Sequence, residues 1–208
     1  FLDNNKLRDK IISETSYETI KRLFTRGKLS AALEKKLRII LGRITKPLAV
    51  RSSGLFEDSL MQPFAGIFET YLLPNINEDI EIRLQQLMDA VKLVYASIYS
   101  DTARSYISAI SYKIEEEKMA VIIQEVVGEQ FENTYYPHIS GVSQSYNYYP
   151  YGYMQPEDGF AVIAVGLGTY VVEGEKAFRF SPKYPNLENN SPKDQFLNSQ
   201  VELLAIDL

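Results

Sequence analysis

The pattern of apolar and polar positions predicts helices in the first half of the chain. Apolar residues recur at helical spacing within residues 30–44, and the hydroxyl of Ser30 is suited to cap the first turn. A longer apolar stripe covers about five turns within residues 78–99, and Asp101 is placed to begin a further helix that reaches residue 110. We therefore expect residues 1–44 to form a helical N-terminal segment and two more helices to follow.

Strands are predicted mainly after these helices. The clearest candidate is 119–127, a run rich in β-branched residues. The other predicted strands are 48–50, 68–73, 140–149, 160–165 and 177–180. Because helices come first and strands gather later, the pattern predicts an α+β fold in two lobes, with a mostly antiparallel sheet.

Composition narrows the class of protein. The chain has 208 residues, 45% of them hydrophobic, which is typical of a soluble globular domain. No apolar run approaches the roughly 18–20 residues of a membrane-spanning helix, so we expect no membrane partner. The net charge of −5 argues against a nucleic-acid partner. The absence of cysteine excludes disulfides and thiolate metal sites, and it fits a cytoplasmic protein.

The charge is unevenly distributed along the chain. Residues 1–50 contain 12 Lys/Arg and 5 Asp/Glu, a balance of +7, while the remaining 10 and 22 give −12. A basic lobe facing an acidic lobe would suit a polyanion together with its metal, whereas the simpler interpretation is a pair of solvated basic helices.

The chain begins at Phe1 without a methionine and ends on the apolar run 201–206, so we expect an excised piece of a longer protein.

A candidate phosphate site follows the first predicted strand. Arg51, Ser52 and Ser53 precede Gly54, so a guanidinium and two hydroxyls meet a backbone that a ligand can approach closely. A second loop, 62–66, has backbone amides suited to close over the same ligand. The alternative on residue chemistry alone is a polar turn at the end of a strand.

Several blocks of sequence follow one another in a set order. They are Leu48-Ala49-Val50-Arg51-Ser52-Ser53, Glu57-Asp58, Phe64-Ala65-Gly66, Glu69-Thr70-Tyr71-Leu72, Tyr95 to Ala103, Met119 to Val127, Ser140-Gly141-Val142 and Gly166-Leu167-Gly168. Over roughly residues 45–180, this ordered set resembles the ATP-binding domain of phosphoenolpyruvate synthases and pyruvate phosphate dikinases.

The resemblance implies an ATP-grasp-like nucleotide-binding domain at 45–183, with 184–208 extending toward a further domain. It implies ATP and Mg²⁺ as cofactors, and transfer of a phosphoryl group to a histidine on a separate domain that carries it to pyruvate. The phosphohistidine and pyruvate-binding domains of the same parent chain would then be the partners.

The same resemblance assigns roles to individual residues. Arg51 would contact the phosphates, and the loop Phe64, Ala65 and Gly66 would lie over them. Glu57, Asp58 and Glu69 would belong to the pocket.

The chain departs from the family pattern in three places. No glycine-rich stretch with a nucleotide-binding lysine precedes residue 45. Thr169 stands where the family has a glutamate that binds metal, and a neutral hydroxyl is a poor ligand for Mg²⁺ beside a triphosphate. Glu157 and Asp158 are weak candidates to restore a carboxylate. A non-catalytic module that senses a nucleotide or docks a partner is therefore the alternative, and the isolated chain is expected to be inactive.

The third departure is a segment rich in tyrosine. Seven of the 15 tyrosines lie from Tyr135 to Tyr153, where they would stack on a ligand, form a docking face or pack along a strand. His138, the only histidine, lies outside any glycine–threonine–serine context like that of the family's phosphoacceptor, so a loop or core role is favoured.

Overall fold

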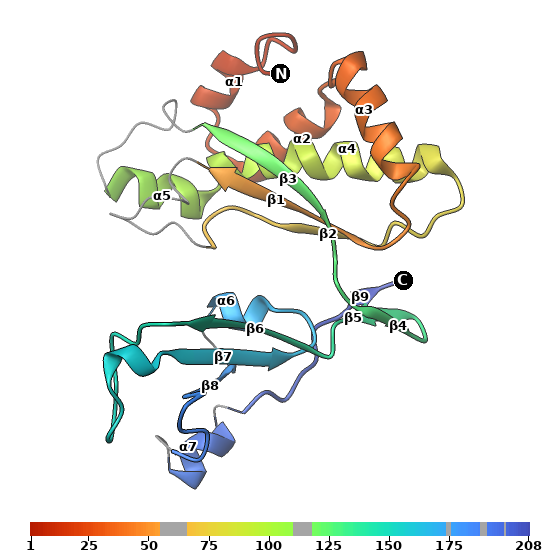
Figure 1. The fold of residues 1–208 in the computed structure, drawn as a ribbon. Coiled ribbons are helices and arrows are strands. Elements are labelled where there is room, and N and C mark those ends of the chain that lie inside the picture. The colour runs from red at the N-terminus through yellow and green to blue at the C-terminus, as the bar shows by residue number, and fades with distance from the viewer. Residues whose placement is uncertain (55–65, 110–117, 174–175, 188–190, 198) are drawn as a thin grey trace. The chain divides into compact units, whose positions relative to one another are not determined.

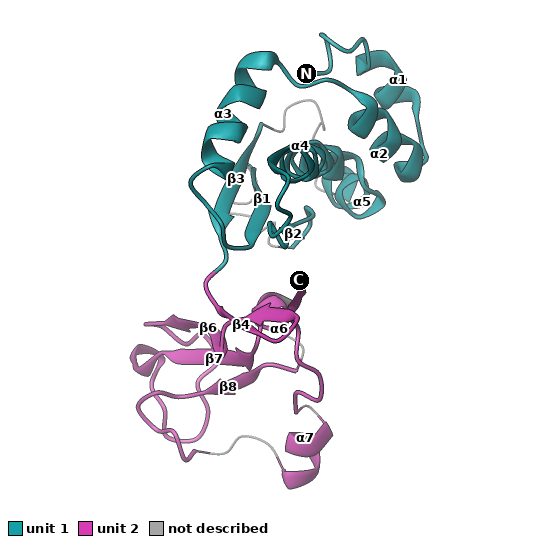
Figure 2. Ribbon diagram, turned by 90° about the vertical axis from the view of Figure 1, so that its right-hand side faces the viewer, with its two compact units in different colours: residues 1–126 teal, residues 127–208 magenta. Residues whose placement is uncertain are grey.

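The computed structural model describes residues 1–54, 66–109, 118–173, 176–187, 191–197 and 199–208. It divides into two compact units, Phe1–Val126 and Val127–Leu208, which are coloured separately in Figure 2. Both units contain antiparallel strands together with helices, so the predicted α+β class is confirmed. The predicted domain boundaries at 44/45 and 183/184 stay a prediction.

Unit 1 begins with three helices, α1 (Arg8–Ser13), α2 (Tyr17–Arg26) and α3 (Ala31–Leu41). The long helix α4 (Ile80–Ala96), a 3-10 turn (Ser97–Tyr99) and α5 (Asp101–Ala109) follow the first two strands. Side-chain oxygens of Ser16, Ser30 and Asp79 cap α2, α3 and α4 by accepting from backbone amides in their first turns. The helices predicted within 30–44 and 78–99 are confirmed, and the helix predicted from Asp101 is confirmed as far as Ala109, since residue 110 lies outside the described residues.

The sheet of unit 1 has the antiparallel order β2-β1-β3, with β1 (Leu48–Gly54) in the middle (Figure 1). β2 (Tyr71–Leu73) pairs with the start of β1, and β3 (Met119–Glu125) pairs with its whole length. The register sets Arg51 opposite Ile122. Strand β2 is shorter than the predicted 68–73. The side chain of Phe68 packs in a separate apolar cluster with Ile98, Ala103 and Ile107 and does not continue the strand.

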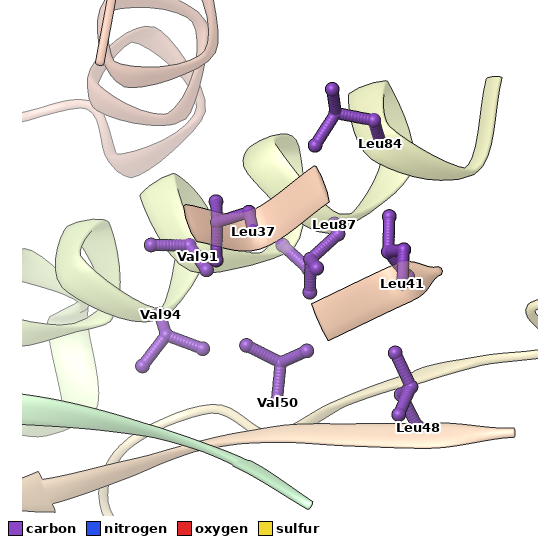
Figure 3. Close-up of a cluster of buried hydrophobic side chains, with 9 residues drawn as sticks. Leu37, Leu41, Leu48, Val50, Leu84, Leu87, Val91 and Val94 are labelled. Atoms are coloured by element: carbon purple, nitrogen blue, oxygen red, sulfur yellow. The ribbon is translucent and has the colours of Figure 1, made fainter. Parts of the chain in front are cut away.

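One face of this sheet is packed against α3 and α4, as Figure 3 shows. Leu48 and Val50 are fully buried on β1. They meet Leu37, Leu41, Leu84, Leu87, Ala90, Val91 and Val94 from the two helices. Full burial of an aliphatic side chain stabilises a fold by about 1.5–3 kcal/mol, so this cluster fixes which face of β1 is turned inward.

A second cluster attaches α1 and α2 to the end of α4. Its buried members are Leu7, Ile11, Ile20, Phe24 and Ala96. Lys92, which is also buried, donates from Nζ to the carbonyl of Thr25 at 2.6 Å and forms an ion pair with Asp89 at 2.7 Å. A cation at the C-terminal end of α2 satisfies a carbonyl that the helix leaves unpaired.

Unit 2 contains two small antiparallel sheets. One has the order β4 (Glu129–Phe131), β5 (Thr134–Tyr136) and β9 (Ile206–Asp207); the other has β6 (Ile139–Gln144), β7 (Phe160–Val165) and β8 (Phe178–Phe180). A 3-10 turn (Pro156–Asp158) and the short helices α6 (Thr169–Glu173) and α7 (Pro192–Leu197) complete the unit. The strands predicted at 160–165 and 177–180 are confirmed.

The strand predicted at 140–149 is wrong in its second half, because β6 ends at Gln144. Asn147 is fully buried, and its Oδ1 accepts from the backbone N–H of Tyr149 at 3.1 Å and from Arg179 Nη2 at 2.9 Å. The Asn147 side chain accepts from the Tyr149 backbone N–H in place of a carbonyl on a neighbouring strand, so the backbone leaves the sheet here.

Within the described ranges, no helix is long and apolar enough to cross a membrane.

Candidate functional site

The face of the unit 1 sheet that is turned away from α3 and α4 carries Arg51. Successive side chains of a strand point to opposite faces, so Arg51 shares its face with Ala49 and Ser53, whereas Ser52 lies in the buried row. The side chain of Arg51 is exposed, and no hydrogen bond or ion pair joins it to the described residues. Among the described residues, the strand therefore presents a guanidinium without a hydrogen-bond or ion-pair partner on the face opposite the helices.

The neighbours of Arg51 on this face are mostly apolar. Ile122 lies directly opposite Arg51 on β3, and Leu72 lies opposite Ala49 on β2. Both side chains are 39% exposed, and Gln124 is exposed on the same row of β3. A guanidinium among exposed apolar side chains suits a ligand with a flat apolar part and an anionic part. Sequence reasoning did not identify Leu72 and Ile122 as neighbours of Arg51. The available signal was the alternation of inward and outward side chains along each predicted strand.

The loop that the resemblance sets over the phosphates lies mostly outside the described residues. Glu57, Asp58, Phe64 and Ala65 all fall there. Gly66 is described: it is exposed and has a φ of +79°, a conformation that glycine adopts without strain. The expected closure of this loop over Arg51 stays a prediction.

Glu69 lies next to two tyrosine hydroxyls at the start of β2. The hydroxyl of Tyr71 donates a hydrogen bond to the Glu69 carboxylate. Burial, reinforced by this carboxylate, raises the pKa of Tyr71 well above its ordinary value. The same two causes raise the pKa of Tyr17, whose hydroxyl is buried on α2. The structure thus surrounds the Glu69 carboxylate with tyrosines of unit 1.

The candidate metal ligands of unit 2 lie at opposite ends of β7. Thr169 is exposed and begins α6 after the strand, whereas Glu157 and Asp158 precede it. Asp158 accepts from the backbone N–H of Gln155 at 2.8 Å and from Lys183 Nζ at 2.6 Å, and these bonds lower the pKa of its carboxyl. The structure therefore does not bring either carboxylate to Thr169. Across the residues that the structure describes, no cluster of three or more His, Asp or Glu side chains could hold a metal.

The tyrosine-rich segment divides into two parts. Tyr135 is buried on β5, whereas Tyr148, Tyr149 and Tyr153 are exposed in the turn region between β6 and β7. Packing along a strand therefore accounts for the first part only. His138 is exposed between β5 and β6, with its ring edge-on to Phe131 at 5.4 Å.

Comparison with known proteins assigns the family. Residues 1–203 match the family described as the pyruvate phosphate dikinase AMP/ATP-binding domain, and the chain belongs to it. A phosphoenolpyruvate synthase of Deinococcus radiodurans is 28% identical over 194 residues, which cover 84% of this chain and 22% of that protein. A phosphoenolpyruvate synthase of Aeropyrum pernix is 29% identical over 170 residues, covering 78% of this chain and 18% of the relative.

A third relative, an uncharacterized phosphotransferase of Bacillus subtilis, is 29% identical over 62% of this chain and 14% of its own length. The chain thus spans about a fifth of the length of the first two relatives, at 22% and 18%. Membership in the family supports ATP binding by this chain and agrees with the predicted resemblance.

Proposed function

We propose that this chain is the ATP-binding portion of a phosphotransferase that resembles phosphoenolpyruvate synthase and pyruvate phosphate dikinase. Arg51 carries this proposal, because it is exposed on the face of the unit 1 sheet away from α3 and α4 and has no hydrogen bond or ion pair to the described residues. Its guanidinium binds phosphate oxygens in a bidentate manner, and Leu72 and Ile122 contact the flat, less polar part of the nucleotide. The ATP-grasp-like arrangement, with Mg²⁺ beside the phosphates, belongs to the same proposal.

In the parent protein, a histidine on a separate domain receives the phosphoryl group. The imidazole nitrogen forms a bond to phosphorus while a P–O bond of the nucleotide breaks, and the bonding electron pair leaves with the nucleotide oxygen. Such transfers depend on positioning and on neutralising charge. Arg51 supplies part of that neutralisation, and the isolated chain, with no recognised acceptor, binds ATP weakly and does not hydrolyse it.

Calorimetric titration of the chain with ATP and Mg²⁺ tests the site. Arg51→Ala is expected to abolish whatever binding is measured, because it removes the guanidinium from the open face. Arg43→Ala is the matched control, since Arg43 is an exposed cation of the same unit. Binding that survives Arg51→Ala would mean that the nucleotide binds elsewhere, and equal loss in Arg43→Ala would mean that the effect is not specific to Arg51.

The second candidate is a non-catalytic module that senses a nucleotide or docks a partner. Thr169 favours it, because this exposed hydroxyl stands at the family's metal-ligand position and neither Glu157 nor Asp158 lies beside it. Phosphorylation of the parent protein by radiolabelled ATP separates the two: an active phosphotransferase retains label on histidine, whereas a module that only binds does not.

A further inference from the structure

Strand β3 is the long edge strand of the unit 1 sheet. It pairs with β1 on one side, and the described residues place no strand on its other side. Its pairing with β1 runs through seven consecutive residues without a bulge, from Met119 to Glu125. Because alternate residues of an antiparallel strand turn their N–H and C=O groups to the same side, about half of the polar groups of β3 face away from β1.

The first five residues of β3, Met119–Ile123, have none of the sequence features that protect an edge. Natural proteins keep edge strands short, or place lysine, proline or a bulge in them, to prevent pairing with another chain. The opposite edge, β2, is only three residues long. The run Met119–Glu125 is more than twice that length, begins with five apolar residues and contains neither lysine nor proline. β3 is therefore built as an inner strand.

Burial on the helix side leads to the same conclusion. Val121 and Ile123, which face α4 and its cluster, are only half-buried, whereas Leu48 and Val50 on β1 are fully buried. The apolar row of the sheet thus continues to β3, where the described residues cover it only in part. An added strand with apolar residues on its helix side would complete this row and bury more of both side chains.

We infer that, in the natural protein, the free edge of β3 pairs with an extended segment of the same polypeptide that lies outside residues 1–208. The relatives supply such sequence, because the matched region is only 22% and 18% of their length. A second copy of the chain is a poorer occupant: a stable interface buries about 1,200–2,000 Å² in total, more than one pair of seven-residue strands provides. A covalently connected strand needs less area, because its effective concentration is of millimolar order.

Amide hydrogen exchange of β3 in the 208-residue chain and in the natural full-length polypeptide tests the inference. In the shorter chain, alternate amides of 119–125 should exchange rapidly while the amides of β1 stay protected. In the full-length protein, those same amides should become protected by at least about tenfold. Rapid exchange of these amides in both proteins would overturn the inference. So would protection that appears in the 208-residue chain only as its concentration rises, since the occupant would then be a second copy.

A substitution on the helix side of β3 sharpens the test. Val121→Lys leaves an edge strand intact, because the long side chain reaches past the edge to water, but it buries a charge once a strand is added. We expect it to lower the protection of the outward amides in the full-length protein, while the β1 amides report that the unit is still folded. Val121→Thr is the matched control, since it keeps the β-branched shape without the charge. Equal protection in the two variants would contradict the inference.

Discussion

The carboxylate of Glu69 accepts a hydrogen bond from the hydroxyl of Tyr71, two residues further along the chain. Tyr71 begins β2 and pairs with Val50, the residue before Arg51, so this bond fixes the entry of β2 beside the strand that carries the proposed phosphate ligand. Burial and the nearby carboxylate raise the pKa of both Tyr71 and Tyr17. The structure therefore gives Glu69 a position inside unit 1 in addition to the pocket role that the family resemblance implies.

These tyrosines predict a loss of stability in base. An unfolded tyrosine has a pKa of about 10, so above that pH the unfolded chain releases protons that the folded chain retains. The free energy of unfolding should then fall as the pH rises above about 10. Urea unfolding at a series of pH values measures the slope. Tyr71→Phe should make it shallower, and Tyr149→Phe, at a residue that is 81% exposed, is the matched control. Equal slopes in all three proteins would contradict the role of Tyr71.

Replacing the buried Lys92 should destabilise unit 1. Lys92→Met keeps the length of the side chain but removes the ammonium that serves Thr25 and Asp89. Leaving buried partners unsatisfied costs about 1–3 kcal/mol each, so we expect the free energy of unfolding to fall by about 2 kcal/mol. Denaturant unfolding measures the difference, with the exposed Lys36→Met as the control. A change no larger than that of the control would show that Lys92 contributes little.

Truncation in the main cluster should cost more. Leu87 is fully buried between α4 and the sheet, and Leu87→Ala should lower the free energy of unfolding by about 2–5 kcal/mol through lost burial and a residual cavity. Ile82→Ala is the control on the same helix, because Ile82 is 45% exposed. Thermal unfolding should separate the two variants clearly, and similar midpoints would mean that the cluster is not the core of unit 1.

The metal-ligand position is tested by restoring a carboxylate. If ATP binds with Mg²⁺ near Thr169, Thr169→Glu supplies an anionic oxygen and should strengthen ATP binding only when Mg²⁺ is present. Calorimetric titrations with Mg²⁺ and with EDTA give the comparison. Thr169→Gln is the neutral control of equal shape and should have no metal-dependent effect. Strengthening by Thr169→Glu in EDTA as well as in Mg²⁺ would sink the assignment.

The sequence by itself determined the local elements and the family. Helical spacing within residues 30–44 and 78–99 located α3 and α4, because their apolar stripes must be buried on one side. The β-branched run after Lys118 located β3, and the ordered blocks around Arg51 indicated the ATP-binding family that the comparisons confirm. These signals are read from neighbouring residues, so a sequence can express them without reference to the rest of the fold.

Only the tertiary structure decided what depends on residues far apart in the chain. The end of β6 at Gln144 depends on Asn147 receiving Arg179, 32 positions away. The burial of Lys92 depends on the end of α2, and the apolar surroundings of Arg51 depend on the register with β2 and β3. Each is a pairing between residues far apart in the chain, and nothing in the sequence next to either partner specifies it. Local patterns therefore fixed which face of each element is apolar, whereas long-range packing decided which side chains meet there.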